Sequence, residues 1–392
     1  MTITLVLPQP PAYSETFFRS KISGLQESGY KVILVTGSSE QKFTECLHLQ
    51  HPRVSQNAFV QILKMGYTFI GLLSHLARII KYIKLEKSNG TSMGRILEKI
   101  YLNSTLLKLD TDWLHYGFAT MAMDRELVGK SIGAKVAVSF RGYDIDVFPL
   151  NKDDVYGKLW HNLDRVHSIS NYLIEKAYEL GLPQDITSEV ITPAVDIDNL
   201  PKCTESSRQR SKKLKIITIA RLHWIKGIDD LIEVAQLLKQ KSIDFEWIIV
   251  GDGDKKHLER YKYRLYEKGL QGEVKLLGKR SHAETLKILC DCSIYVQTSL
   301  SEGFCNAVLE AQAMGKLCIV TDGGALIENV ENGKSGWVVP KLDPESMRDK
   351  IIEVSSLSSI ETNEISNYAR LRVKRLFTLE NQKRQFNRFY NS

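Results

Sequence analysis

The sequence predicts an α/β protein of two domains, each built on a parallel, doubly wound sheet. First, a chain of 392 residues is too long for one compact core and suggests about two domains of ~100–200 residues each. Second, short apolar runs alternate with helical segments in both halves, which is the pattern of βα units. Third, the alternation restarts at Lys215, after a polar and basic segment at 201–213 that is typical of a connector.

The first half begins with a strand at 3–7 and a helix from Ser14. Residues 1–8 lack the basic start and the small-residue cleavage site of a signal peptide, so we interpret them as a strand. Ser14 is a natural N-cap, and Glu15 suits the first turn of a helix. The same alternation predicts strands at 31–36, 113–116, 136–140, 165–169 and 190–191, and helices at 93–108, 121–128 and 172–180.

Residues 60–84 are the most apolar part of the first half, and two interpretations of them remain open. Aliphatic and aromatic side chains alternate there with basic ones such as Lys64, Arg78 and Lys81. The basic residues interrupt the stretch too often for a transmembrane span of ~20 apolar residues. The pattern fits either a helix lying on an anionic bilayer or a core helix that covers a sheet and carries snorkelling lysines.

The second half is predicted to hold an anion beside its first strand. Arg221 follows the strand at 215–220, and Lys226 and Gly227 lead into a helix at 228–239. Two cations and a helix N-terminus then surround one anion, which Arg can grip bidentately and Lys as a point charge. A solvated charge pair is the alternative. Further strands are predicted at 247–250, 274–277, 294–296 and 317–320.

The stretch 299–315 is predicted to carry two carboxylates beside the start of a buried helix. The helix begins after Gly303 and is closed by Gly315 at its C-terminal cap. Glu302 lies just outside its start, where free backbone N–H groups and the positive end of the helix dipole collect. Glu310 lies inside the apolar helix and therefore needs a hydrogen-bonding partner.

This arrangement suits an anionic ligand that is rich in hydroxyls. The backbone amides of Phe304, Cys305 and Asn306 can bind phosphate oxygens, while the two carboxylates accept hydrogen bonds from hydroxyls. The alternative is a helix start with one acid near the dipole and the other acid in an unrelated ion pair.

Charge and cysteine content limit the classes of partner. The formal net charge of +7 favours anionic partners such as nucleotides, phosphates or acidic membrane surfaces. The Lys and Arg residues are dispersed and no nucleic-acid module is visible, so we expect no nucleic-acid partner. The six cysteines show no framework spacing, and we expect most of them to be small core residues in a reducing cytoplasm.

The segment Glu302-Gly-Phe-Cys-Asn-Ala-Val-Leu-Glu310 resembles the two-glutamate motif of glycosyltransferase family 4. These are retaining enzymes of the GT-B fold, in which two Rossmann-like domains face each other across a cleft. The resemblance implies that Glu302 contacts the donor sugar and that Glu310 contacts the ribose hydroxyls. It implies that Arg221 and Lys226 hold the donor diphosphate and neutralise the leaving group. The donor-binding residues that it implies are Gly303, Phe304, Cys305, Asn306, Glu310, Gly251, Lys279 and Arg280.

The resemblance also implies chemistry without a metal or another cofactor, the nucleotide-sugar being a substrate. Cys290-Asp-Cys292 lacks a second ligand pair. The pairs Asp144–Asp146 and Asp252–Asp254 match an Asp-x-Asp metal signature only superficially, because such short patterns recur by chance. We therefore expect no metal site.

Residues on the acceptor side are implied by weaker matches in the first half. The loop 8–18, with Ser14 and Glu15, resembles the N-terminal loop of polysaccharide-building members, where it borders the cleft. A plain helix start is the alternative. The segments that contain His115 and Asp144 also resemble family segments that follow strands.

Arg141 departs from the family pattern, because most relatives carry a His at this place, beside the reacting sugar. Arg cannot act as a base near neutral pH. If Arg141 lies in the cleft, it binds an anion or a sugar hydroxyl; otherwise it forms a structural ion pair with Asp144 or Asp146. We include Arg141 with Glu302 and the two donor-side cations among the expected catalytic residues.

The resemblance spans nearly the whole chain and implies its domain limits. The acceptor-side domain is expected at 1–197, joined by a C-terminal helix at about 375–392. The nucleotide-sugar-binding domain is expected at 212–374.

The expected function is retaining transfer of a sugar from a nucleotide-sugar, with UDP-hexose favoured, to a hydroxyl of a glycan or lipid-linked acceptor in polysaccharide biosynthesis. The expected location is the cytoplasm. Residues 60–84 leave open whether the protein also contacts the inner face of the cell membrane. The alternatives are a catalytically altered GT-B protein that binds a sugar nucleotide and another GT-B enzyme such as a sugar-nucleotide epimerase. A dinucleotide oxidoreductase is disfavoured, because no Gly-x-Gly-x-x-Gly follows the first strand.

Overall fold

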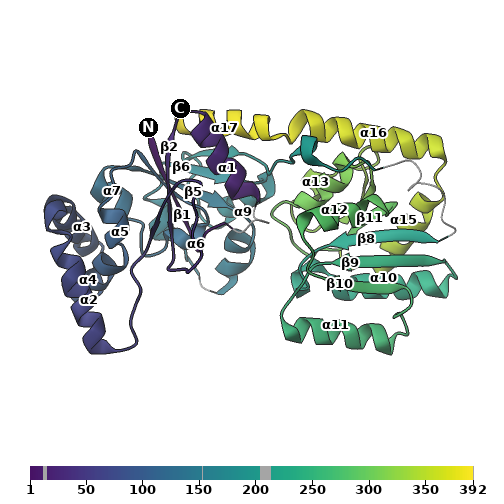
Figure 1. Cartoon of the computed structure of the whole chain (residues 1–392), viewed down its shortest axis with the longest axis horizontal. Helices are drawn as coiled ribbons and strands as arrows, with labels where there is room; N and C mark the ends of the chain where they lie inside the picture. Colours follow the sequence, from purple (N-terminus) through teal and green to yellow (C-terminus); the bar gives the residue numbers. More distant parts are fainter. Residues whose placement is uncertain (12–15, 152, 204–212, 392) are drawn as a thin grey trace. The chain divides into compact units, whose positions relative to one another are not determined.

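The computed structural model describes residues 1–11, 16–151, 153–203 and 213–391, and the chain divides into two compact units (Figure 1). The first unit comprises Met1–Ile191 with Lys383–Ser392, and the second comprises Thr192–Gln382. The segment after Ile191 packs on the second unit, because Val195 N donates to Phe377 O at 2.8 Å and Gln382 Nε2 donates to Thr192 O at 3.0 Å. The first unit therefore ends at Ile191, before the expected limit of 197.

A parallel, doubly wound sheet forms the first unit, as the sequence predicts. Within the described residues it has seven strands in the order β3-β2-β1-β4-β5-β6-β7, and the order reverses between β1 and β4. The strands are β1 (Thr2–Leu7), β2 (Lys31–Thr36), β3 (Leu47–Gln50), β4 (Trp113–Tyr116), β5 (Lys135–Phe140), β6 (Arg165–Ser168) and β7 (Thr187–Val190). The edge strand β3 is not apparent from the sequence, because Leu47-His-Leu-Gln is short and half polar.

The helices of the first unit are more divided than predicted. They are α1 (Thr16–Glu27), α2 (Ala58–Ile70), α3 (Leu76–Ser88), α4 (Met93–Leu102), α5 (Ser104–Leu107), α6 (Ala119–Ala122), α7 (Val128–Ile132), α8 (Gly157–Trp160), α9 (Asn171–Glu179) and the returning α17 (Leu379–Asn391). The continuous helix predicted at 121–128 is wrong, because Asp124 has a φ of 62° and interrupts it. The helix predicted at 93–108 is divided at Asn103.

The second unit repeats the architecture. Within the described residues its six parallel strands lie in the order β10-β9-β8-β11-β12-β13, which reverses between β8 and β11. The strands are β8 (Leu214–Ile219), β9 (Phe245–Val250), β10 (Val274–Gly278), β11 (Ile294–Gln297), β12 (Leu317–Thr321) and β13 (Trp337–Val339). The helices are α10 (Ile228–Gln240), α11 (Lys255–Glu267), α12 (His282–Cys290), α13 (Asn306–Ala313), α14 (Leu326–Asn329), α15 (Pro344–Ser355) and α16 (Ser359–Leu376).

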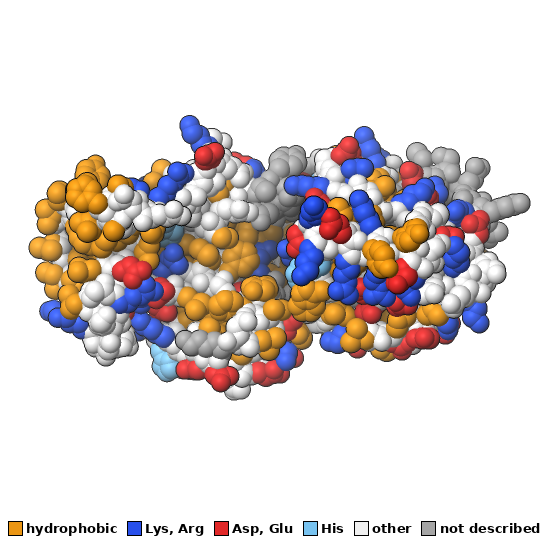
Figure 2. Space-filling view, turned by 90° about the horizontal axis from the view of Figure 1, so that it is seen from below, with side chains coloured by type: hydrophobic (Ala, Val, Ile, Leu, Met, Phe, Trp, Pro, Cys, Tyr) orange, Lys and Arg blue, Asp and Glu red, His pale blue; other side chains and the backbone are white. Residues whose placement is uncertain are grey.

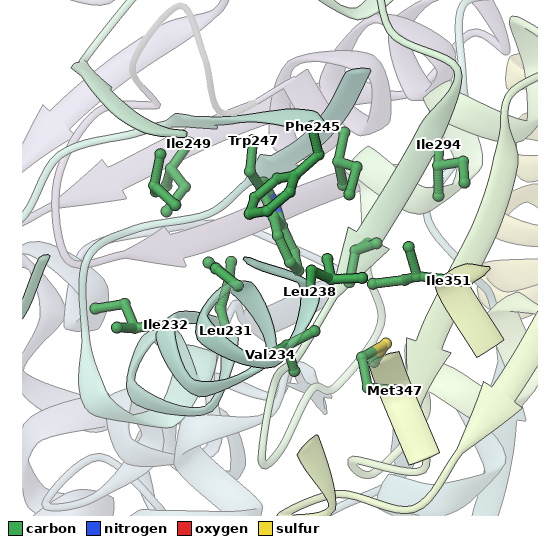
Figure 3. Close-up of a cluster of buried hydrophobic side chains, with 14 of the residues drawn as sticks. Leu231, Ile232, Val234, Leu238, Phe245, Trp247, Ile249, Ile294, Met347 and Ile351 are labelled. Carbon is green, nitrogen blue, oxygen red and sulfur yellow. The ribbon is translucent and has the colours of Figure 1, made fainter. Parts of the chain in front are cut away.

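A buried apolar cluster fixes β8, β9 and β11 against α10 (Figure 3). Trp247 on β9 is wholly buried and faces Leu231 and Leu238 of α10, which recur at helical spacing. Its indole N–H donates to Thr218 Oγ1 at 3.1 Å, so the one polar atom of the ring is satisfied. The cluster holds the strand ends of the second sheet in fixed positions, and the loops that follow them start from a rigid base.

The helix α2 does not belong to the core, which corrects the interpretation of residues 60–84 as a buried helix. No residue of α2 is buried, and Tyr67 is 82% exposed. In α3, by contrast, Ile79 and Tyr82 are buried. Among the described residues no single helix is long and apolar enough to cross a membrane, although Ala58–Ile70 and Leu73–Ser88 meet the length and composition criteria as a pair bent by 52°.

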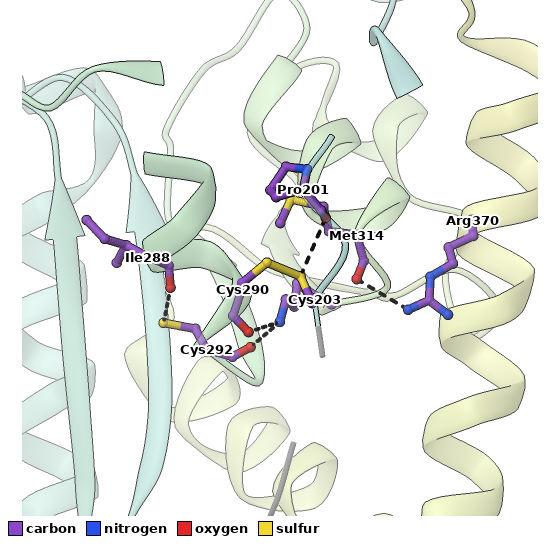
Figure 4. Close-up of a disulfide and its surroundings, with 8 residues drawn as sticks. Pro201, Cys203, Ile288, Cys290, Cys292, Met314 and Arg370 are labelled. Carbon is purple, nitrogen blue, oxygen red and sulfur yellow. Dashed lines mark hydrogen bonds between the residues drawn. A yellow bond between two sulfur atoms is a disulfide. The ribbon is translucent and has the colours of Figure 1, made fainter. Parts of the chain in front are cut away.

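Cys203 and Cys290 form a disulfide in the second unit (Figure 4). The expectation of reduced core cysteines is wrong for this pair. The sequence does not predict the bond, because 87 positions separate the two residues. Cys292, Cys305 and Cys318 are free and buried, as expected of small core residues. The disulfide ties the segment before residue 204 to the end of α12.

Candidate active site

Two loops that carry predicted donor-side residues meet at the edge of the second sheet where the strand order reverses. The loop 220–227 follows β8, and the loop 298–305 follows β11. Open α/β sheets bind ligands outside the carboxyl ends of their strands at such a reversal. The two loops are in direct contact, because Leu300 N donates to Ile225 O at 2.8 Å and Thr298 Oγ1 donates to Gly227 O at 2.9 Å.

Two glycines allow this close approach. Gly227 has a φ of 63°, and a Cβ at this position would overlap the carbonyl oxygen of Thr298. A Cβ at Gly323, after β12, would overlap the carbonyl oxygen of Ser299. Only glycine fits both places, so the loops pack backbone against backbone.

Lys226 and Glu302 form an ion pair across these loops. Lys226 Nζ lies 2.6 Å from Glu302 Oε1, and the two side chains are only 14% and 10% exposed. Ser299 Oγ donates to the same carboxylate oxygen at 2.9 Å, and Ala325 N donates to Glu302 O at 2.8 Å. The carboxylate and the ammonium are therefore held in place without a ligand, and an entering anion would compete with Glu302 for Lys226.

Other predicted cations lie on the loops at the same edge. Arg221, two residues after β8, is exposed and forms no ion pair within the described part of the chain. Burial, followed by the charges of His257, Arg221 and Lys226, lowers the pKa of His223, so both predicted cations lie within electrostatic reach of this ring.

Lys279 and Arg280 follow β10 and are also exposed. Gly251, in the turn after β9, donates from its amide to Gly278 O at 3.1 Å, which ties that turn to the end of β10. The turns predicted to face the nucleotide therefore stand at the carboxyl ends of neighbouring strands.

The start of α13 offers fewer free amides than the sequence predicts. Cys305 N donates to Asn329 Oδ1 at 3.0 Å, and Asn329 Nδ2 donates to Cys305 O at 3.1 Å. The prediction that the Cys305 amide binds a phosphate oxygen is therefore wrong. The amides of Phe304 and Asn306 find no acceptor in the part of the chain that the structure describes, so they remain available. Burial raises the pKa of the Cys305 thiol to about 12, so this cysteine is no nucleophile at neutral pH.

Glu310 has the partner that its place on α13 requires. His282 Nε2 lies 2.8 Å from Glu310 Oε1. His282 is the first residue of α12, behind a capping box formed by Ser281 and Glu284. The hydrogen bond to Glu310 raises the pKa of His282.

We expect His282→Ala to destabilise the protein more at about pH 5.5 than at about pH 9. A raised folded-state pKa means that the ion pair stabilises the fold fully below the unfolded pKa of ~6.5 and is lost as pH rises through the folded pKa. Because the His282 side chain is 39% exposed, solvent screening keeps the difference below about 1 kcal/mol. Urea unfolding of wild type and variant at both pH values measures it, and equal differences at the two pH values would argue against a charged pair.

His115 is wholly buried, so its prediction as an acceptor-side residue is wrong. His115 Nε2 shares a hydrogen bond with Ser139 Oγ at 2.8 Å, and Nδ1 shares one with Tyr390 OH at 2.6 Å. Lys21 Nζ lies 3.3 Å from Nε2. Burial, followed by the charge of Lys21, lowers the pKa of His115 far below its usual value. His115 thus helps to hold α17 on the sheet of the first unit.

Asp144 is also buried, and its prediction as an acceptor-side residue is wrong. Its carboxylate accepts hydrogen bonds from the amides of Ala119 and Arg141, both at 3.0 Å. Burial raises the pKa of Asp144. The side chain therefore ties the loop after β5 to the start of α6.

The guanidinium of Arg141 lies over two aromatic rings. It is 4.0 Å from the ring centre of Phe17 and 4.5 Å from that of Phe18, within cation–π range. The sequence suggested either a ligand contact or an ion pair with Asp144 or Asp146, and it did not suggest this contact with aromatic rings. Ser14 and Glu15 lie outside the described residues.

The two Asp-x-Asp pairs support local structure. Besides Asp144, Asp146 Oδ1 accepts from Tyr172 OH at 2.7 Å, and Asp254 Oδ1 accepts from His257 N at 2.8 Å at the start of α11. Within the described residues, no three His, Cys, Asp or Glu side chains are grouped so as to hold a metal ion.

Sequence reasoning missed three residues that shape this site: Ser299, His282 and Asn329. Ser299 lies in the stretch 299–315 that the sequence singled out, three residues before Glu302, but no local pattern gave its side chain a role. His282 and Asn329 lie 28 and 24 positions from their partners, so only the fold brings them together.

Comparisons with known proteins find glycosyltransferases. Residues 202–372 match the family described as glycosyl transferases group 1. WcaL of Salmonella typhimurium, named as a colanic acid biosynthesis glycosyltransferase, is 25% identical over 407 residues that cover 98% of each chain. The amylovoran biosynthesis glycosyltransferase AmsK of Erwinia amylovora is 26% identical over 382 residues that cover 91% of each chain. The predicted resemblance to glycosyltransferases of polysaccharide biosynthesis is confirmed.

Solved structures share the fold over the whole chain. HepE of Anabaena, in complex with UDP and glucose, matches with a TM-score of 0.73 and 15% identity, covering 100% of this chain and 99% of the other. The sucrose-phosphate synthase of Thermosynechococcus elongatus matches with a TM-score of 0.76 and 15% identity, covering 99% and 98%. These similarities confirm the predicted GT-B fold.

Proposed function

On the premise that this chain is a group 1 glycosyltransferase of the GT-B fold, we propose that it transfers a hexose with retention from a UDP-hexose to a hydroxyl of a glycan or lipid-linked acceptor. The observation that carries the proposal is the ion pair of Lys226 with Glu302, held between two loops at the strand reversal of the second sheet. UDP as the donor nucleotide is supported by the solved relative that binds UDP and glucose. A polysaccharide pathway is supported by the names of the relatives that match the full chain.

Charge stabilisation is the main contribution of these residues to the proposed reaction. When the glycosidic bond of the donor breaks, negative charge accumulates on the departing diphosphate. Lys226 and Arg221 supply positive charge there, and the free amides at the start of α13 supply hydrogen-bond donors. Lys226 exchanges its contact with Glu302 for the diphosphate, which frees the Glu302 carboxylate to accept from sugar hydroxyls. Glu310 accepts from the ribose hydroxyls in place of His282.

Calorimetry with UDP tests the donor site. We expect UDP to bind without added divalent metal, because the two cations neutralise the diphosphate themselves. A strict requirement for metal would contradict this mechanism. Screening nucleotide-sugars by thermal stabilisation then identifies the sugar. UDP release from the stabilising donor supports a transferase, whereas binding without any turnover would favour a non-catalytic sugar-nucleotide-binding protein.

The same proposal includes contact with an anionic membrane through α2 and the segment Leu73–Ser88. Figure 2 shows hydrophobic side chains gathered over the end of the first unit that holds α2 and α3. The exposed apolar residues there are Phe59, Val60, Ile62, Leu63, Tyr67, Ile70, Leu73, Leu76 and Ile80. Lys64, Lys81 and Lys84 are exposed beside them, and the one acid of these segments, Glu86, is buried against Lys99. An apolar face with a basic border suits a bilayer that contains anionic lipids.

We expect the double variant Ile62→Glu/Leu63→Glu to weaken binding to vesicles that contain phosphatidylglycerol by at least tenfold, because burial of each apolar side chain is worth roughly 1.5–3 kcal/mol. Both positions are exposed, so the fold should be unaffected. Vesicle co-sedimentation measures the change. Leu371→Glu, at an equally exposed position on α16, is the control and should leave binding unchanged. Equal binding by all variants would exclude α2 as the contact.

A further inference from the structure

The first unit contains a cavity of about 530 Å³ that is lined by none of the predicted donor-side residues. Its walls are Pro8 after β1, residues 37–40 after β2, residues 51–54 after β3, and Met121 and Arg125 after β4. The strand order reverses between β1 and β4, so the cavity occupies the place where open α/β sheets bind ligands. Its volume is within the range of about 300–1,000 Å³ that is common for ligand pockets.

Two guanidinium groups of the cavity have no carboxylate partner. Arg125 Nη1 donates to the carbonyls of Met121 and Met123 at 3.1 and 3.4 Å, while its buried Nε meets no acceptor within the described residues. Arg53 is exposed and forms no ion pair in the described part of the chain. Among the described residues of the wall Glu40 is the one acid, so they carry two positive charges against one negative charge. The cavity therefore favours an anion.

His51 adds a neutral group to the same wall. Neither of its buried ring nitrogens has a partner at hydrogen-bond geometry within the described residues. Burial, followed by the charge of Arg125, lowers the pKa of His51 to about 4, so the imidazole is neutral at pH 7. The backbone of Leu102 lies near one of its ring nitrogens, and the other is a buried polar atom that a ligand can satisfy.

The wall of the cavity leads along the chain into the exposed apolar helix α2. Val54 belongs to its wall and lies three residues before Asn57, the N-cap of α2. Ser55 N donates to Gln61 Oε1 at 2.8 Å, which ties this connection to the helix. A ligand with its anionic part in the cavity therefore has an apolar surface next to it.

We propose that this cavity binds the phosphate group of a lipid-linked acceptor, with Arg53 and Arg125 on the phosphate oxygens and the lipid chain leaving along α2. Arg pairs bidentately with phosphate, and a second Arg and the His51 N–H complete the set of donors. The combination of a cationic cavity and an adjoining apolar helix matches a ligand with a phosphate head and a hydrocarbon chain. The identification of the ligand as the acceptor rests on the proposed function.

Calorimetry of decyl phosphate, below its micelle concentration, with the full chain tests the inference. Arg53→Gln and Arg125→Gln should each weaken binding by about tenfold, as expected for the loss of one charge-assisted hydrogen bond. Arg53 has no described side-chain partner, so its variant should fold normally even if the Arg125 variant disturbs α6. Arg388→Gln, on an exposed arginine of α17, is the matched control and should bind as wild type does.

A comparison of three ligands shows whether binding depends on the phosphate group, on the hydrocarbon chain or on both. Inorganic phosphate and decyl maltoside should each bind at least tenfold more weakly than decyl phosphate. Equal binding of inorganic phosphate would overturn the lipid assignment, and equal binding of decyl maltoside would overturn the role of the phosphate. Wild-type affinity for decyl phosphate in both cavity variants would overturn the cavity as the site.

UDP titrations of the same proteins distinguish a failure of this inference from a failure of the proposed function. Normal UDP binding by Arg53→Gln, together with weakened decyl phosphate binding, supports a separate site in the first unit. Failure of wild type to bind UDP would overturn the proposed donor site, whatever the result with decyl phosphate.

Discussion

Lys226→Ala is expected to lower kcat/KM for sugar transfer by about two to three orders of magnitude, the size typical for the loss of one preorganised group that stabilises developing charge. Lys226 stands between two loops, with its ammonium 2.6 Å from Glu302. Without it, the departing diphosphate loses a cation in a partly desolvated site. Steady-state transfer assays measure the change, and thermal unfolding checks the fold. Arg221→Ala and Glu302→Gln are also expected to lower transfer strongly while the fold stays intact.

A double variant separates charge stabilisation from structural support. Lys226→Ala leaves the Glu302 carboxylate without its cation, so part of any loss of stability comes from an unpaired charge. Lys226→Ala/Glu302→Gln removes this charge and should recover stability but not activity. If the double variant recovered activity, Lys226 would act only by holding Glu302. Lys239→Ala, at the other end of α10 and paired with Glu273 at 2.9 Å, is the matched control and should leave transfer unchanged.

Gly227→Ala is expected to destabilise the second unit and to abolish most of the transfer activity. Two effects add at this position. First, a backbone with a φ of 63° destabilises the fold by about 1–2 kcal/mol when the residue carries a Cβ. Second, the new Cβ would overlap the carbonyl oxygen of Thr298. Because Thr298 begins the loop that carries Glu302, relief of the overlap moves the Lys226–Glu302 pair apart. Thermal unfolding and transfer kinetics of the same preparation measure both effects.

Gly269→Ala provides a control with the same backbone strain. Gly269 has a φ of 61°, and a Cβ there would meet nothing within 4 Å. This variant should show the modest loss of stability that the left-handed backbone imposes, with normal transfer. If Gly227→Ala behaved like Gly269→Ala, the contact between the two loops would have no part in the site.

The sequence predicts the donor side better than the acceptor side, because the donor-side signals are local. Arg221, Lys226 and Glu302 follow apolar strands at fixed distances along the chain, and parallel strands bring such segments to one edge of a sheet. In the first unit the weak matches at His115 and Asp144 fail. Both side chains follow or end strands, but burial turns them inward, and a local pattern does not report how neighbouring elements cover a position.

By itself, the sequence determined the doubly wound sheets and the placement of Arg221, Lys226 and Glu302 on loops that follow strands, because alternating hydrophobicity and loop spacing are local properties of the chain. Only the tertiary structure decided that His282 pairs with Glu310, that Asn329 occupies the Cys305 amide, that Cys203 meets Cys290, and that α2 remains outside the core. Each of these depends on which distant surfaces come together when the apolar area is buried, and the sequence order does not encode that pairing directly.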